Sequence, residues 1–219
     1  NEEIDKLRHA ATTALLTRKD VIIVASVSCI YGVGSPQNYA EMAIKFQKGE
    51  RRLLDKTLRL LNDMQYRRND VDLHRGTFRV KGDVLDIFPA GADMVYRIEF
   101  FGDEVERITE IDHLTGEILA EDDSVTVFPC SHYVTPKEQI NKIIPEIEAE
   151  YENRLAFFEK ENKLLEAQRL TQRVTFDVEM LKETGFVKGI ENYSRYLTNR
   201  KEGEQPATLM DYFPDDYLL

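Results

Sequence analysis

Charged and apolar side chains alternate along residues 74–90, which read HRGTFRVKGDVLDIFPA. Successive side chains of a β-strand point to opposite faces, so we expect Phe78 and Val80 on one face and Arg79 and Lys81 on the other. The alternation therefore predicts a β-strand with one apolar face and one cationic face.

The dipeptide Gly82-Asp83 interrupts this alternation and is typical of a two-residue hairpin loop. Glycine in the first position is the preference of a type II′ turn. Folding the chain at this loop pairs side chains of matching character on both faces of the hairpin. The expected cross-strand pairs are Val80 with Leu85, Phe78 with Ile87 and, on the charged face, Arg79 with Asp86.

The segment YRIEFF, which begins at Tyr96, repeats the pattern of apolar and charged side chains. Its charged face adds Arg97 and Glu99, next to the cations of the hairpin. The stretches FGDE and DHLTGE follow as further turn signals. Residues 76–130 therefore predict an antiparallel meander with one apolar and one charged face.

The segments before the hairpin have other periodicities. Residues 2–17 and 51–66 place apolar side chains at helical spacing and predict amphipathic helices. Residues 21–25, VIIVA, are continuously apolar and predict a strand buried on both faces, as in a parallel α/β sheet. Gly32 and Gly34 follow; we interpret them as a structural turn, and a nucleotide-binding loop is the less favoured alternative.

The C-terminal part of the chain has a helical pattern again. Thr135 and Glu138 have the spacing of a capping box, with Pro136 at the first helical position. The apolar stripe that follows predicts a helical hairpin or one long bent helix, ending near Gly185. The final residues, ATLMDYFPDDYLL, resemble the start of a buried strand, so we expect the sequence to be cut from a longer chain.

Composition limits the function classes. The 219 residues carry a formal net charge of −11, which disfavours general binding to polyanions but permits a local basic patch. The two cysteines and four histidines show no metal-binding spacing. No segment reads as a signal peptide or as a membrane span, which favours a cytoplasmic protein without a membrane partner.

The sequence shows no self-sufficient active site. It has no Gly-x-x-x-x-Gly-Lys-Ser/Thr loop and no nucleophile elbow. Asp215 and Asp216 are interpreted as solvated surface residues. The stronger signal is a basic stripe of Arg75, Arg79, Lys81 and Arg97 on adjacent strands, with Arg67 and Arg68 nearby in the loop. It is either an ordinary solvated sheet face or a docking surface that meets carboxylates on a partner protein. Duplex DNA fits this stripe less well, because the interspersed acids would repel phosphate.

Several longer motifs resemble those of the UvrB family, the damage-verifying, helicase-like subunits of bacterial nucleotide excision repair. They are RGTFRVKGDVLDIFPA, RIEFFGDEVERI, LTGE, SHYVTP, ENKLLEAQRLTQR, GIENYSRYL and DYFPDDYLL, and the likeness runs from Ile4 to Leu219. The related transcription–repair coupling translocases share a version of the first two motifs only. A DNA-binding piece of such a translocase is therefore the alternative.

The resemblance implies an α+β fold, in which an antiparallel β-meander module with a helix is inserted into parts of an α/β RecA-like helicase domain that also carries a long helical segment. Residues 1–41 would belong to the first helicase domain, and residues 42–130 would form the UvrA-interacting β-rich domain. Residues 131–219 would form the helical segment and return to the helicase domain. In the family the phosphate-binding loop precedes this region and the acidic magnesium motif follows it. ATP and Mg²⁺ would thus serve the full-length protein, with no catalytic residue, metal site or cofactor in this chain.

The resemblance also implies partners and site residues. UvrA would bind this chain, and damaged double-stranded DNA and UvrC would bind through the full-length protein. The family's UvrA-contacting residues fall on Arg68, Arg75, Arg79, Lys81, Arg97 and Glu99. Lys81 stands where an arginine is common, which keeps the charge but loses the bidentate fork. The residues implied on the DNA side are Arg8, Tyr133, Glu191 and Arg195.

Overall fold

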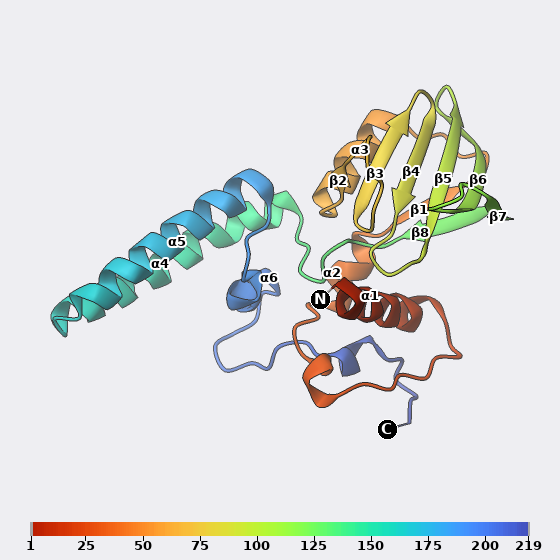
Figure 1. Ribbon diagram of the computed structural model, residues 1–219. Coiled ribbons are helices and arrows are strands. Elements are labelled where there is room, and N and C mark those ends of the chain that lie inside the picture. The colour runs from red at the N-terminus through yellow and green to blue at the C-terminus, as the bar shows by residue number, and fades with distance from the viewer. Residues whose placement is uncertain (1, 219) are drawn as a thin grey trace. The chain divides into compact units, whose positions relative to one another are not determined.

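A computed structural model describes residues 2–218 and divides the chain into two compact units (Figure 1). The first unit contains the residues up to His132 together with those from Ala207 onward. The second unit is Tyr133–Pro206. Each unit has its own hydrophobic core. Within the described residues, no helix combines the length and the apolar character that crossing a membrane requires.

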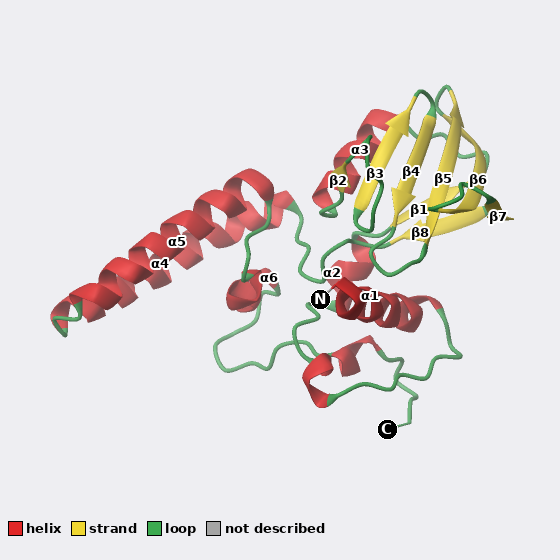
Figure 2. Ribbon diagram, in the orientation of Figure 1, coloured by secondary structure: helices red, strands yellow, loops and turns green. Residues whose placement is uncertain are grey.

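A six-stranded sheet dominates the first unit, with its strands in sequence order (Figure 2). The first pair, β2 and β3, is parallel, and the other neighbours are antiparallel, so the predicted meander is confirmed from β3 to β7. The strands are β2 (Arg67–Arg68), β3 (Thr77–Lys81), β4 (Val84–Phe88), β5 (Met94–Phe101), β6 (Glu104–Asp112) and β7 (Ile118–Glu121).

The β3–β4 hairpin has the predicted register. Phe78 lies opposite Ile87, Val80 opposite Leu85 and Arg79 opposite Asp86. Gly82 has a φ of +61°, and Asp83 is not among the residues with positive φ. A positive φ at the first loop position alone distinguishes a type II′ turn from a type I′ turn. The turn chemistry and the hydrophobic pattern thus fix the same register.

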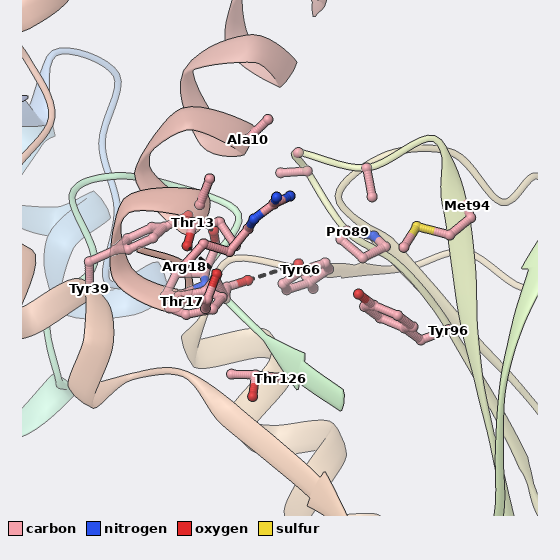
Figure 3. Close-up of a pocket in the computed structure, with 16 residues that line it drawn as sticks. Ala10, Thr13, Thr17, Arg18, Tyr39, Tyr66, Pro89, Met94, Tyr96 and Thr126 are labelled. Carbon is pink, nitrogen blue, oxygen red and sulfur yellow. Dashed lines mark hydrogen bonds between the residues drawn. The ribbon is translucent and has the colours of Figure 1, made fainter. Parts of the chain in front are cut away.

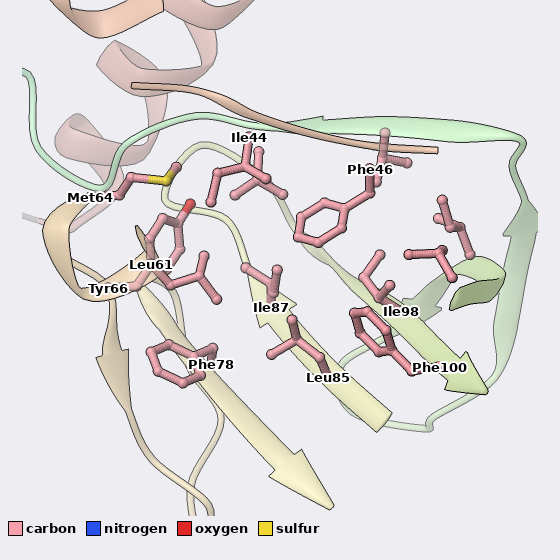
Figure 4. Close-up of a cluster of buried hydrophobic side chains, with 14 residues drawn as sticks. Ile44, Phe46, Leu61, Met64, Tyr66, Phe78, Leu85, Ile87, Ile98 and Phe100 are labelled. Atoms are coloured by element: carbon pink, nitrogen blue, oxygen red, sulfur yellow. The ribbon is translucent and has the colours of Figure 1, made fainter. Parts of the chain in front are cut away.

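The inner face of this sheet is covered by α3 (Leu54–Asp63) and by a separate two-stranded sheet of β1 (Ile44–Gln47) and β8 (Ser124–Val127). Figure 4 shows Phe46 and Leu61 in this cluster. The expectation that the meander continues to residue 130 is wrong for β8, which pairs with β1 instead. Its apolar side chains gain burial this way, since Val127 is completely buried.

The core between these layers contains side chains from segments that are distant in sequence. Its buried members come from β1, α3, the residues just after α3, β3, β4, β5, β6 and β8. The buried residues are Ile44, Phe46, Leu61, Met64, Tyr66, Phe78, Leu85, Ile87, Ile98, Phe100, Val105, Ile108, Val125 and Val127. The outward residues of the sheet therefore rest on a well-packed layer, which holds their backbones in place.

The first unit also contains α1 (Glu2–Thr17), η1 (Val27–Ile30), α2 (Pro36–Glu41) and η3 (Leu209–Tyr212). The helix predicted over residues 2–17 is confirmed. The strand predicted over residues 21–25 is wrong: these residues form no strand, and Ile22 and Val24 are 92% and 96% exposed. A strand needs N–H and C=O partners on a neighbour, and no described segment pairs with this one.

The second unit is a helical hairpin of α4 (Lys137–Lys160) and α5 (Leu164–Thr184), followed by η2 (Ile190–Tyr193) and α6 (Ser194–Leu197). The hairpin prediction is confirmed, and Gly185 ends α5 in the left-handed conformation with a φ of +73°. The apolar stripe of α4 packs against that of α5. The buried residues of the two stripes are Ile140, Ile143, Ile144, Ile147, Val174, Val178 and Leu181.

The predicted capping box at the start of α4 is wrong. Pro136 occupies the N-cap position, and no side chain caps the helix. The amides of Gln139 and Ile140 donate to the Pro136 carbonyl. Because the helix begins one residue later than predicted, the Thr135 hydroxyl lies outside the position from which an N-cap side chain reaches the first turn.

Gly91 packs directly against the backbone of α1. A Cβ at this position would lie 2.7 Å from the Ala10 nitrogen and 2.9 Å from the His9 carbonyl carbon. We expect Gly91→Ala to lower the free energy of unfolding by about 1–3 kcal/mol, because neither backbone can yield easily. Gly82→Ala is the comparison, because a Cβ at Gly82 meets no atom within 4 Å and is strained only by the positive φ. We expect Gly82→Ala to lower the free energy of unfolding by about 1 kcal/mol. Urea unfolding of both variants measures the difference, and equal costs would contradict the close approach.

Candidate functional site

Two arginines on the outer face of the sheet converge on one carboxylate. Arg79 of β3 donates from Nε to Oδ2 of Asp86 at 2.8 Å. Arg97 of β5 donates from Nε to Oδ1 at 2.7 Å and from Nη2 to Oδ2 at 3.0 Å. Asp86 lies on β4 between them and opposite both in register, so a single row across three strands carries a plus–minus–plus pattern.

Asp86 is almost completely buried, with 2% of its surface exposed. Burial alone would raise the pKa of its carboxyl, but the hydrogen bonds from Arg97 and Arg79 outweigh burial and hold that pKa below its usual value. The two arginine side chains remain partly exposed, at 23% for Arg79 and 32% for Arg97. The row therefore presents positive charge to solvent while its negative charge is covered.

A second charged row lies one pleat further toward the β3–β4 turn. Lys81 is exposed at the end of β3, and Glu99 stands opposite Arg107 on the neighbouring pair β5–β6. Arg107 donates from Nε and Nη2 to Glu121 of β7, at 3.0 and 2.8 Å. The outer face is thus cationic toward β3 and mixed toward β7, and sequence reasoning missed Arg107 and Glu121 as part of it.

Arg68 adds an exposed cation at the β2 edge of the sheet. Its Nε donates to both oxygens of Asp70, at 2.9 and 3.2 Å, and the side chain is 52% exposed. Asp70 also accepts the backbone N–H of Val80 at 3.0 Å, which lowers the pKa of the Asp70 carboxyl. Arg68 is therefore tethered at the edge of the sheet beside β3, where its partner in register is Phe78.

Arg75 is turned away from these rows, which differs from the expectation of one continuous stripe. Its Nε donates to the Ala92 carbonyl at 2.9 Å, and its guanidinium pairs with Asp93 and lies 5.6 Å from the centre of the Phe88 ring. Asp93 also accepts Lys6 of α1 at 3.2 Å. Arg75 thus links the loop after β4 to α1.

An apolar patch on the outer face explains this placement. Phe88, Val95 and Ile111 occupy outward positions, yet all are buried, with Leu73 packed against them. The loop between β2 and β3, which carries Leu73 and Arg75, therefore covers this end of the outer face. The outward apolar side chains at these three positions were the sequence signal that could have revealed the covered end.

The residues implied on the DNA side are divided between the two units. Arg8 belongs to the first unit and donates to the carbonyls of Tyr31 and Gly32 at 2.8 and 2.7 Å. Tyr133, Glu191 and Arg195 belong to the second unit. Tyr133 packs on its hydrophobic core, and Glu191 is exposed.

Arg195 is engaged within the second unit. Its Nη2 donates to Glu150 of α4 at 2.8 Å, and its guanidinium lies 4.5 Å from the centre of the Tyr196 ring. The Tyr196 hydroxyl also bonds to Glu150. A phosphate would have to compete with the Glu150 carboxylate for this guanidinium.

Two histidines that are distant in sequence meet beside α1. The rings of His9 and His132 stack at 4.0 Å, and Tyr39 of α2 joins them, with its hydroxyl 2.9 Å from His9 Nδ1. The Thr12 hydroxyl lies 3.2 Å from His132 Nε2. The two histidines are far apart in the sequence, so no local pattern predicts their contact. The stack joins the segment that leads into the β-rich module to the segment that leads out of it.

This stack gives the chain an acid-sensitive stability. Burial is the largest effect on His9 and, with the charge of Arg8, lowers its pKa to about 4 against the opposing charge of Asp5. The unfolded chain then binds a proton near pH 6.5 that the folded chain does not, so stability falls as the pH drops from 6.5 toward 4. We expect His9 to contribute a loss of about 2 kcal/mol between pH 7 and pH 5.

Urea unfolding at the two pH values measures this loss. The matched variant is His9→Gln, whose side chain does not titrate. We expect its stability to vary between pH 7 and pH 5 by about 2 kcal/mol less than that of the natural chain. Equal pH dependence in the two proteins would show that His9 does not stay neutral in the folded state.

A cavity of about 250 Å³ lies between α1 and the start of the loop after β4 (Figure 3). Tyr39, Tyr66 and Tyr96 line it together with threonine side chains and Arg18. The hydroxyls of Tyr66 and Tyr39 donate to the carbonyls of Phe128 and Pro129, at 2.9 and 3.2 Å. These two hydrogen bonds hold the segment after β8 in place. The residues that line the cavity include no nucleophile paired with a base, so they do not indicate an active site.

Potential metal ligands do not gather in the part of the chain that the structure describes: no three His, Cys, Asp or Glu side chains come together. Both cysteines are free thiols, and burial raises the pKa of Cys130 to about 11, which makes it a poor nucleophile at neutral pH. The charged outer face is therefore the most developed candidate site, and exposed ion-pairing side chains are of the kind that suits protein recognition.

Comparison with protein families gives two matches. Residues 44–133 match the model of the "UvrB interaction domain", and residues 138–199 match that of the "UvrB third helical domain". The first match covers the β-rich module with its charged outer face, and the second covers the helical hairpin with the turns that follow it.

Curated relatives align with the whole chain. It is 59% identical over 220 residues to "UvrABC system protein B" of Carboxydothermus hydrogenoformans and of Bacillus licheniformis. It is 56% identical to the protein of that name from Streptococcus pneumoniae strain Hungary19A-6. Each alignment covers 100% of this chain and 33% of the relative, so the chain spans about a third of the length of these relatives.

Proposed function

The chain belongs to the UvrB family, and on that premise we propose that it docks UvrA through the outer face of its β-rich module in bacterial nucleotide excision repair. The observation that carries this proposal is the row of Arg79 and Arg97, held side by side on a rigid sheet by Asp86. Rigid, partly exposed guanidinium groups are the side chains that protein interfaces use most often as charged anchors.

The charge distribution defines the partner surface. We name Arg68, Arg79, Lys81, Arg97 and Glu99 the docking face. Three of its cations lie on β2 and β3, and Arg97 lies on β5 together with the anion, Glu99. A complementary surface on UvrA would carry carboxylates opposite the cations and a basic group opposite Glu99.

Arg75 is assigned a different part in the same docking. Its guanidinium is engaged by the Ala92 carbonyl and by Asp93, so its contribution to UvrA binding would be to hold the loop after β4 against the module. In this proposal its substitution weakens docking less than substitution of Arg79 or Arg97, because its guanidinium is held by the Ala92 carbonyl and Asp93 at the other end of the face.

Chemistry with ATP and Mg²⁺ is assigned to the rest of the full-length protein. The chain has no Gly-x-x-x-x-Gly-Lys-Ser/Thr loop to hold the phosphates, so its residues do not fit that cofactor. We likewise assign damaged DNA and UvrC to the full-length protein. Contacts of Arg8, Tyr133, Glu191 and Arg195 with DNA are the weaker part of the proposal, since Arg195 is already paired with Glu150.

Size-exclusion chromatography of this chain with and without UvrA tests the proposal. We expect the chain to elute with UvrA at low ionic strength and to separate from it as salt is raised, because partly exposed ion pairs are screened. Separate elution at all salt concentrations would refute the docking function. ATP hydrolysis by the chain alone, in proportion to its amount, would refute the assignment of that chemistry elsewhere.

A further inference from the structure

Asp86 occupies a place where an apolar residue would suit stability equally well. It points to the outer face between Val84 and Phe88, the other outward residues of β4, and only 2% of its surface is exposed. Taking a carboxylate and two guanidinium groups out of water has a large desolvation cost, and apolar replacements of buried ion pairs are often neutral or stabilising. Stability alone therefore does not explain a carboxylate at this position.

The hydrogen bonds of Asp86 explain why a carboxylate is present at this position. Asp86 accepts Nε–H of Arg79, and Nε–H and Nη2–H of Arg97. Hydrogen bonds at Nε fix the plane of a guanidinium group and leave donors on its terminal nitrogens for another acceptor. Asp86 accepts from Nε of Arg79, and among the described residues none accepts a hydrogen bond from its two terminal nitrogens. The Arg79 side chain is 23% exposed.

We propose that Asp86 is a positioning residue of the docking face, one that orients Arg79 and Arg97 so that both present their terminal nitrogens to carboxylates of the partner. This inference rests on the proposed function. Long cationic side chains lose much rotational freedom when they bind, and a side chain already fixed in the free protein has less to lose. Asp86 thus contributes to affinity without touching the partner.

The placement also sets the spacing of the partner's acceptors. Arg79 and Arg97 stand on strands separated by one strand, β4, and neighbouring strands lie roughly 4.8 Å apart. The two side chains nevertheless converge: Arg79 Nε and Arg97 Nη2 bond to the same oxygen, Asp86 Oδ2, at 2.8 and 3.0 Å, so these nitrogens lie no more than about 6 Å apart. A partner surface that fits them carries its carboxylates close together, above the row.

The variant Asp86→Asn separates positioning from net charge. It preserves the size of the side chain, removes one negative charge and places an amide N–H₂ where a guanidinium donor needs an acceptor. Charge alone predicts tighter binding of the more cationic face to an acidic partner. Positioning predicts weaker binding, and we expect the dissociation constant for UvrA to rise about tenfold.

The control is Asp103→Asn, which removes the same charge from an exposed residue in the β5–β6 turn. We expect its affinity for UvrA to be unchanged or slightly higher. A second readout uses the free chain: the Nε–H protons of Arg79 and Arg97 should exchange with water faster in Asp86→Asn than in the natural chain. If Asp86→Asn does not fold, Asp86→Ser tests the same idea, because serine leaves no carboxylate between the two guanidinium groups. Arg97→Lys tests the docking face itself, since lysine retains the charge without the fork.

Two outcomes distinguish the possible failures. Faster exchange of the arginine protons with unchanged affinity, for both Asp86→Asn and Arg97→Lys, would show that this face does not dock UvrA. Reduced affinity for Arg97→Lys, together with equal or tighter binding by Asp86→Asn, would preserve the docking function and overturn the positioning role.

Discussion

The chain with Arg68→Glu and Lys81→Glu is expected to bind UvrA about 100-fold more weakly than the natural chain, a loss of about 2.7 kcal/mol. Both side chains are exposed at the cationic edge of the docking face, so reversing their charges places two carboxylates against an acidic partner. The free energy of unfolding should change by less than about 1 kcal/mol, because neither cation contacts a buried charge. Isothermal titration calorimetry measures the affinity.

The matched control is Lys142→Glu with Arg169→Glu, which makes the same change in net charge on exposed positions of α4 and α5. We expect it to bind UvrA within a factor of about 3 of the natural chain at physiological salt, where charges beyond about 8 Å are screened. An equal loss in both double variants would mean that net charge, and not the docking face, governs the association.

Reversal of Arg79 and Arg97 is a poorer experiment, even though these two side chains define the row. Either substitution leaves Asp86 buried beside fewer cations, and an uncompensated buried charge destabilises a protein by about 3–5 kcal/mol. Loss of binding in such a variant could not be separated from loss of the fold. Exposed members of the docking face give the cleaner answer.

Phe46→Ala is expected to lower the free energy of unfolding by about 3–5 kcal/mol. Phe46 is completely buried in the core between the six-stranded sheet and the β1–β8 pair, and its ring is 5.1 Å from the Arg52 guanidinium. Its removal leaves a cavity that the surrounding side chains can fill only in part. Since small domains are stable by only about 5–15 kcal/mol, this is a large share of the total.

Phe101→Ala serves as the control, because Phe101 lies in the neighbouring hairpin but is 77% exposed. We expect its effect to lie within about 0.5 kcal/mol. Thermal and urea unfolding, followed by the fluorescence of the tyrosines, measure both variants. A small effect of Phe46→Ala would mean that the β1–β8 pair does not belong to the cooperative core of the module.

The hairpin and its register were predictable from the sequence because two independent signals agreed there. The alternation of Phe78 and Val80 with Arg79 specified the faces, and Gly82-Asp83 specified the turn. A shift of one residue would have exposed every apolar side chain, so the pattern admits a single register. The helical hairpin was predictable for a similar reason, since a periodic apolar stripe indicated the helices and Gly185 indicated where the second one ends.

The wrong predictions of strands concern segments whose structure depends on pairing with residues far away in the sequence. Residues 21–25 have strand composition, yet the structure gives them no neighbouring strand. The pairing of β8 with β1 depends on residues about 80 positions apart, which local alternation does not encode. The capping box failed for a local reason: a helix start is uncertain by a residue or more, and the cap hydrogen bond requires the correct position.

The sequence predicted which cations belong to the candidate site. It did not predict which charged side chains contact one another there. Sequence alternation placed Arg79 and Arg97 on the outer face, and both lie there. It could not show that they share Asp86, because that contact involves three strands at once. Nor could it show that Arg75 turns toward Asp93, since Arg75 lies in a loop before β3, where no period of two applies.

The most direct test of the account follows the arginine side chains of the chain while UvrA is added. In a chain labelled with ¹⁵N-arginine, we predict that the Nε–H signals of Arg68, Arg79 and Arg97 shift or broaden first. The signals of Arg169 and Arg173 in the helical hairpin should persist at the same UvrA concentration. Formation of the complex with the first three signals unchanged would contradict the claim that the outer face of the sheet binds the partner.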